Sequence, residues 1–114
     1  HTLEKIKQAN ITIHGIGDAL KMAHRRQSSD EVIERLQHHQ AVGEAFGYYF
    51  DAQGQIVHKV KTIGLQLEDL ENKDFIFAVA GGQSKGEAIK AYLSIAPENT
   101  VLITDEAAAK VILQ

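Results

Sequence analysis

The chain has 114 residues, the size of a single domain, and its 44% hydrophobic and 24% charged residues are typical of a globular domain rather than a disordered one. Its 12 Lys and Arg against 15 Asp and Glu give a formal charge of −3, so we do not expect this segment to hold DNA or RNA itself. The lack of cysteine excludes disulfides, cysteine zinc sites and thiol nucleophiles, and the short apolar runs predict no membrane span or signal peptide, hence a cytoplasmic protein.

Three segments share a pattern in which a short apolar strand is followed by a tight turn and an amphipathic helix. The predicted strands are residues 11–17, 75–80 and 100–104, and the helices that follow them are residues 18–26, 85 to about 93, and 107–113. Runs of β-branched residues that are apolar on both faces are typical of strands buried between two helical layers. The alternation predicts an α/β fold, a three-layer Rossmann-like parallel sheet flanked by helices.

The pattern changes between the first and second units. Apolar residues at helical spacing predict a helix over residues 30–40, with Ser29 or Asp30 as its N-cap. Two β-prone runs, residues 44–50 and 55–60, flank a four-residue turn and predict a β-hairpin. We expect the aromatic residues of its first strand to pack against the sheet, and an oligomer interface is the alternative.

The predicted sheet is small for its class. Residues 2–9 predict only a turn or two of amphipathic helix, and three parallel strands are fewer than most parallel sheets contain. We therefore expect the chain to be a partial domain, with the rest of the sheet supplied by a missing part.

The most informative stretch for chemistry is residues 80–85 (AGGQSK), between a buried strand and a helix. Ligands of open α/β sheets bind at the carboxyl ends of strands, and a glycine turn there lets backbone N–H groups approach an anion. Gly82, Ser84 and Lys85 are therefore candidate anion-binding residues. Alternatively, the glycines only shape the turn, and Ser84 forms a capping box with Glu87.

A similar arrangement follows the first strand. Gly15 and Gly17 are candidate pocket residues, and Asp18 is the expected N-cap of the next helix. Because the Asp18 charge competes with an anion at that helix end, this loop meets either the uncharged part of a ligand or no ligand. Arg25 and Arg26 lie two turns further on and, because neighbouring helical residues point about 100° apart, at most one of them should face a site. That residue would be a good phosphate ligand, while the alternative is that both only oppose the helix dipole.

Glu44 opens the aromatic strand, where it is either solvent-exposed or an acceptor for sugar hydroxyl groups. The histidine spacing predicts no metal site, and no serine-hydrolase motif is present, so we expect no catalytic residue and no cofactor. The competing interpretation is a sugar-phosphate isomerase or deaminase, with Glu44 or Asp105 and His14 or His24 moving protons. Against it, Asp105 looks like the N-cap of the last helix.

Taken together, these motifs carry a family resemblance. They are residues 15–19 (GIGDA), 22–26 (MAHRR), 44–50 (EAFGYYF), 80–85 (AGGQSK) and 102–108 (LITDEAA). In this order they resemble the C-terminal half of the sugar-binding effector domain of SorC-type bacterial transcriptional regulators, and most closely the branch that represses glycolytic genes.

The resemblance implies a fold related to sugar-phosphate isomerases and a homo-oligomeric repressor, whose operator DNA is bound by an N-terminal helix-turn-helix absent from residues 1–114. It implies fructose 1,6-bisphosphate or a related phosphosugar as the effector. Arg25 and Lys85 would then contact phosphate or sugar oxygens, Glu44 would accept from sugar hydroxyls, and Gly15, Gly17, Gly82 and Ser84 would line the pocket. Because the family's other half supplies part of the phosphate site, we expect this chain alone to bind more weakly than a whole domain.

Overall fold

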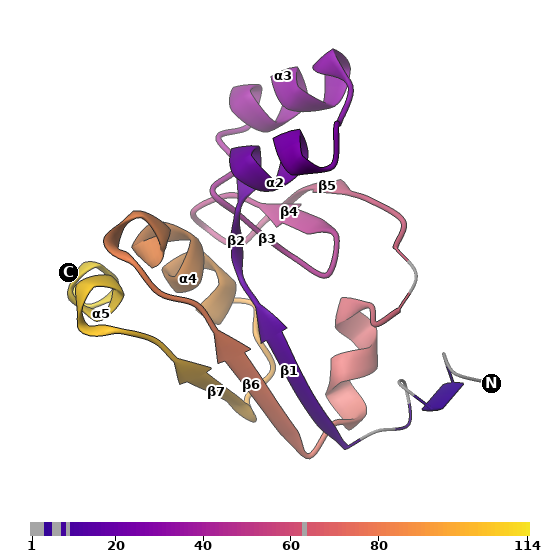
Figure 1. Ribbon diagram of the computed structural model, residues 1–114, viewed down its shortest axis with the longest axis vertical. Helices are drawn as coiled ribbons and strands as arrows, with labels where there is room; N and C mark the ends of the chain where they lie inside the picture. The colour runs from indigo at the N-terminus through magenta and orange to yellow at the C-terminus, as the bar shows by residue number, and fades with distance from the viewer. Residues whose placement is uncertain (1–3, 6–7, 9, 63) are drawn as a thin grey trace.

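The computed structural model describes residues 4–5, 8, 10–62 and 64–114, and the helical turn predicted at residues 2–9 falls largely outside them. Its strands form a three-stranded and a four-stranded sheet (Figure 1). The three-stranded sheet is parallel, in the order β1 (Ile11–Gly15), β6 (Phe75–Val79), β7 (Thr100–Ile103). The three predicted parallel strands and the α/β class are thus confirmed.

Helices cover one face of this sheet in the part of the chain that the structure describes. Helices α4 (Gly86–Leu93) and α5 (Glu106–Ile112) bury side chains such as Ile89 and Ala108 in one core with Ala78 of β6. A short helix, η1 (Leu67–Asn72), was not predicted; its Leu67 packs against the same core. The sequence predicted a further helical layer on the opposite face, and no described element supplies it.

That opposite face is apolar and exposed. Residues that pair in a parallel register point to the same side of the sheet. Ile11 therefore shares this face with its partner Phe75, and Phe77 shares it with its partner Val101. Ile13 is 72% exposed, and four further side chains of this face are about half exposed: Ile11, Phe75, Val101 and Ile103. A patch of this kind on a parallel sheet marks a surface that another element covers.

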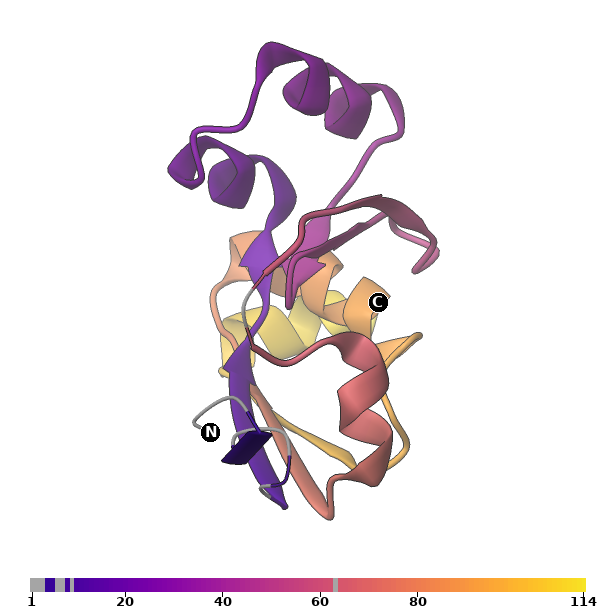
Figure 2. The same ribbon diagram turned by 90° about the vertical axis from the view of Figure 1, so that its right-hand side faces the viewer.

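The four-stranded sheet is antiparallel and carries a pair of helices. Its strands are β2 (Gly17–Asp18), β3 (Gly43–Ala45), β4 (Tyr48–Phe50) and β5 (Ile56–Lys59). Helices α2 (Ala19–Arg25) and α3 (Asp30–His38) pack on it through Ala19, Ala23, Leu36 and Tyr49, away from the parallel sheet (Figure 2). The predicted caps are confirmed: Asp18 accepts a hydrogen bond from the backbone N–H of Lys21, and Ser29 accepts one from Val32.

The prediction of a single strand over residues 44–50 was wrong. This segment is two strands, β3 and β4, joined by a two-residue turn in which Phe46 has φ of 56° and Gly47 has φ of 84°. Positive φ at both central residues is the geometry of the type I′ hairpin turn. The hairpin predicted across residues 51–54 does form, between β4 and β5. The aromatic residues Tyr49 and Phe50 are fully buried, which supports packing over an interface role for these two.

Replacing Gly47 by alanine should destabilise the protein by about 2–4 kcal/mol, because the residue needs positive φ and a Cβ there would lie 2.6 Å from the Val60 carbonyl oxygen. Gly82→Ala is the control, since Gly82 has φ of 97° but a Cβ would meet nothing within 4 Å. Urea denaturation should show that Gly82→Ala lowers the free energy of unfolding by only about 1 kcal/mol. Equal losses would show that the contact with Val60 is unimportant.

Candidate functional site

The ends of β1 and β2, the turn after β3 and the loop after β6 surround one depression of about 370 Å³. Its lining consists of His14, Gly15, Ile16, Gly17, Met22, Arg25, Glu44, Phe46 and Lys85. Five predicted site residues therefore come together: Gly15, Gly17, Arg25, Glu44 and Lys85. His14 and Lys85, 71 residues apart in sequence, meet here because the parallel crossovers bring the carboxyl ends of the strands to one edge.

The loop after β6 presents Lys85 to this depression. Gly82 has positive φ, and its N–H donates to Oδ2 of Asp105 at 2.8 Å, which ties the loop to the start of α5. Within the described residues, the Lys85 ammonium makes no ion pair, and Lys85 also lines a smaller adjoining depression together with Arg25. Gly82 and Ser84 belong to the same loop but do not line the larger depression.

The capping-box alternative for Ser84 was wrong. A 3₁₀ turn, η2 (Gln83–Lys85), leads into α4, and Lys85 is the N-cap residue, with no side-chain cap hydrogen bond. Ser84 is exposed and does not cap this helix. Asp105, in contrast, is the predicted N-cap of α5, where Oδ1 accepts from the Ala108 N–H at 2.9 Å.

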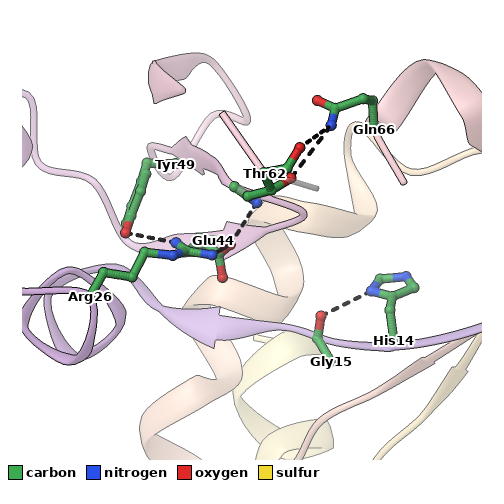
Figure 3. A network of polar contacts seen from close by, with 8 residues as sticks. His14, Gly15, Arg26, Glu44, Tyr49, Thr62 and Gln66 are labelled. Atoms are coloured by element: carbon green, nitrogen blue, oxygen red, sulfur yellow. Dashed lines mark hydrogen bonds and ion pairs between the residues drawn. The ribbon is translucent and has the colours of Figure 1, made fainter. Parts of the chain in front are cut away.

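Arg25 and Arg26 diverge, as their helical spacing predicted. Arg25 lines both depressions and forms no ion pair in the described part of the chain. Arg26 turns instead to the antiparallel sheet, donating to the Tyr49 hydroxyl at 2.9 Å and to Oε2 of Glu44 at 3.0 Å (Figure 3). The helical spacing predicted that the arginine not facing a site would be solvated, and the alternative was that both only oppose the helix dipole; neither expectation included this structural ion pair.

Glu44 is buried, with 4% of its surface exposed, so the solvent-exposed interpretation was wrong. Its Oε2 accepts from Arg26 and, at 2.7 Å, from the N–H of Gly47, which holds the β3–β4 turn. Its Oε1 lies toward Gly17, where a Cβ would approach it to 3.5 Å. This geometry leaves Oε1 without a hydrogen-bond donor from the described residues at the edge of the depression, and a glycine at position 17 keeps it accessible.

His14 and Phe46 line the depression but were not predicted as ligand residues; their proximity to Gly15 and Glu44 in sequence was the only signal. A carbonyl oxygen only accepts, so Nδ1–H of His14 donates to the Gly15 carbonyl at 2.9 Å, and Nε2 lies 3.4 Å from the Tyr92 hydroxyl. Burial lowers the pKa of His14, against the opposing effects of the Gly15 carbonyl and Glu44. Burial raises the pKa of Tyr92 to about 12, so the hydroxyl keeps its proton. His14 is therefore a neutral, internally bonded ring.

Because the folded-state pKa of His14 is below 6.5, the unfolded chain binds more protons and stability should fall as the pH drops below about 6.5. His14→Gln should flatten this dependence. The test compares the melting temperatures of the two proteins from pH 7.5 down to 5. His58, whose pKa is also lowered by burial, contributes the same pH dependence to both, so the difference between the two curves reports His14. Parallel curves for the two proteins would contradict the assignment.

Comparison with known proteins identifies the family. A family model described as "Putative sugar-binding domain" matches residues 1–114. The chain belongs to this sugar-binding domain family. It is 55% identical over 95% of its length to the Central glycolytic genes regulator of Priestia megaterium, and 52% identical over 98% to that of Bacillus subtilis. It spans 31% and 33% of those proteins.

A solved structure of a related regulator agrees with the fold. A SorC family transcriptional regulator from Enterococcus faecalis superposes with a TM-score of 0.93 at 49% identity, over 98% of this chain and 45% of that one. The SorC-type resemblance is thus confirmed. The Priestia, Bacillus and Enterococcus relatives are all named as regulators, not as isomerases.

The two carboxylates of the enzyme interpretation already have structural partners. Both oxygens of Asp105 accept hydrogen bonds from backbone N–H groups, and Glu44 forms an ion pair with Arg26.

Among the described residues, no group of three or more His, Asp or Glu is placed to hold a metal ion, and no helix has the length and hydropathy needed to cross a membrane.

Proposed function

We propose that this chain forms the C-terminal half of the effector-binding domain of a cytoplasmic repressor of glycolytic genes, and that its depression binds a phosphorylated sugar, with fructose 1,6-bisphosphate as the effector. The observation that carries the proposal is the meeting of two cations without anionic partners among the described residues, Arg25 and Lys85, beside a buried carboxylate, Glu44. Two cations facing one cavity attract an anion, and a carboxylate beside them suits the hydroxyl groups of a sugar.

Each residue has a distinct role in this proposal. Lys85 and Arg25 bind phosphate oxygens, Arg25 through its planar fork. Oε1 of Glu44 accepts from a sugar hydroxyl, while Oε2 stays on Arg26 and Gly47. Gly15 and Gly17 leave room for the ligand, and Gly82 and Ser84 shape the loop that carries Lys85.

The regulatory mechanism we propose is a population shift. The phosphosugar favours one arrangement of the effector domains in a homo-oligomer, and the difference in affinity between arrangements alters how DNA-binding domains, outside residues 1–114, meet their operator. Two facts support a regulatory role that involves domains outside residues 1–114. The Priestia and Bacillus relatives are named as regulators of glycolytic genes, and this chain matches only 31% and 33% of their lengths.

The exposed face of the parallel sheet supports the partial-domain organisation. We expect the remainder of the domain to cover Ile13 and its neighbours on β1, β6 and β7. The segment of the Priestia megaterium relative that matches this chain should bind a hydrophobic dye, and the complete effector domain of that protein should bind much less. Equal dye binding by both would contradict this organisation.

The function itself is tested by titrating the ¹⁵N-labelled chain with fructose 1,6-bisphosphate, fructose 6-phosphate and inorganic phosphate, because NMR detects millimolar affinities. We expect the largest shifts for the bisphosphate, at the amides of Gly15, Gly17, Gly82 and Lys85. Absence of shifts at these amides for all three ligands, in this chain and in the complete domain of the Priestia relative, would overturn the proposal.

A further inference from the structure

Phe46 occupies a backbone conformation that an aromatic residue rarely adopts. It is the first central residue of the β3–β4 turn, with φ of 56°, where Asn, Asp or Gly is usual. The left-handed conformation costs a non-glycine residue on the order of 1 kcal/mol, and such strain concentrates where a side chain has a functional position to keep.

The turn is held in place from both sides. Oε2 of Glu44 accepts the Gly47 N–H at 2.7 Å, and the Gly47 carbonyl accepts the N–H of Val60 at 2.8 Å. The Phe46 ring is consequently fixed over the depression, half-buried, with its centroid 4.5 Å from that of His14. The Tyr92 ring packs edge-on against His14, with the two ring centroids 5.3 Å apart.

We infer that the rings of Phe46 and His14 form an aromatic wall that contacts the carbon skeleton of the bound phosphosugar and selects sugar phosphates over other anions of similar charge. This inference rests on the proposed function. The charged side of the same depression, Arg25 and Lys85, attracts any phosphate and does not distinguish a sugar from a polyphosphate. A sugar ring has an apolar C–H face that gains from contact with an aromatic face, and a polyphosphate has none.

The hydrogen bonds of His14 suit this role. Both ring nitrogens are engaged with the protein, Nδ1 with Gly15 and Nε2 with Tyr92, so the ring has no free donor or acceptor for the ligand. It presents a neutral aromatic surface beside Phe46. The polar contacts to the sugar are then left to Glu44, on β3 two residues before Phe46.

Phe46→Asn tests the wall, because asparagine suits the turn while the ring is lost. NMR titrations of the chain with fructose 1,6-bisphosphate and with pyrophosphate compare the two ligands. We expect about a tenfold loss of affinity for the sugar bisphosphate and less than about a twofold change for pyrophosphate. Phe46→Leu, which keeps apolar packing against the core, should show the same selective loss. Phe75→Asn, on the exposed face of the parallel sheet, should change neither affinity.

Any of four results would overturn the inference. Unchanged affinity for the sugar bisphosphate in both Phe46 variants would show that the ring does not contact the ligand. Equal losses for the two ligands would show that Phe46 only shapes the cavity. Failure of both the unaltered chain and the complete effector domain of the Priestia relative to bind either ligand would remove the proposed function and this inference together, whereas binding that is lost in Lys85→Ala but not in the Phe46 variants would remove this inference alone.

Discussion

Lys85→Ala is expected to weaken binding of fructose 1,6-bisphosphate by about 10- to 100-fold, the effect of losing a charge-assisted hydrogen bond to phosphate. Lys85 faces the depression without an anionic protein partner among the described residues, so its substitution removes a ligand contact and leaves no carboxylate unpaired. The folding stability should therefore change little. Chemical-shift titration and the melting temperature without ligand measure the two effects separately.

Lys90→Ala is the matched control for this prediction. Lys90 lies on α4, further along the chain, and donates to the backbone carbonyl of Gln114, away from the depression. Its loss should leave the affinity within about twofold, as expected for a screened charge at a distance. Equal losses in the two variants would indicate a general electrostatic attraction instead of a defined phosphate contact, and would count against the assigned site.

Arg26→Met is expected to lower the free energy of unfolding by about 2–4 kcal/mol, because it leaves the buried Glu44 carboxylate without its charged partner. The Arg26 side chain is 29% exposed and that of Glu44 is 5% exposed, so the charge left behind is the poorly solvated one. The substitution also removes the hydrogen bond to the Tyr49 hydroxyl. Urea denaturation monitored by circular dichroism measures the loss.

Arg25→Met provides the comparison within the same helix turn. Arg25 has no ion pair in the described part of the chain, so its substitution should cost less than about 0.5 kcal/mol while weakening ligand binding. The double variant Arg26→Met, Glu44→Gln should recover part of the stability, since the amide oxygen of glutamine still accepts from the Gly47 N–H without carrying a charge. Similar stability losses for the two single arginine variants would contradict the ion-pair assignment.

The local elements were largely predictable because their signals are short-range. The β-branched runs at β1, β6 and β7 predicted the parallel strands, and capping residues such as Asp18 and Asp105 marked the starts of α2 and α5. The β3–β4 turn was missed because its left-handed position holds phenylalanine, which no turn preference selects. A second helical layer was expected from strands apolar on both faces, and the described residues leave that face of the sheet exposed.

The sequence by itself determined the α/β class, the glycine turns at the strand ends and the residue types of the candidate site. Spacing along α2 also predicted that Arg25 and Arg26 would not share a direction, because helical geometry is local. Only the tertiary structure decided which arginine faces the depression, that Glu44 is buried against the other, and that Phe46 and His14 meet across it. These outcomes depend on contacts between segments far apart in the chain, and long-range packing, not local preference, selects them.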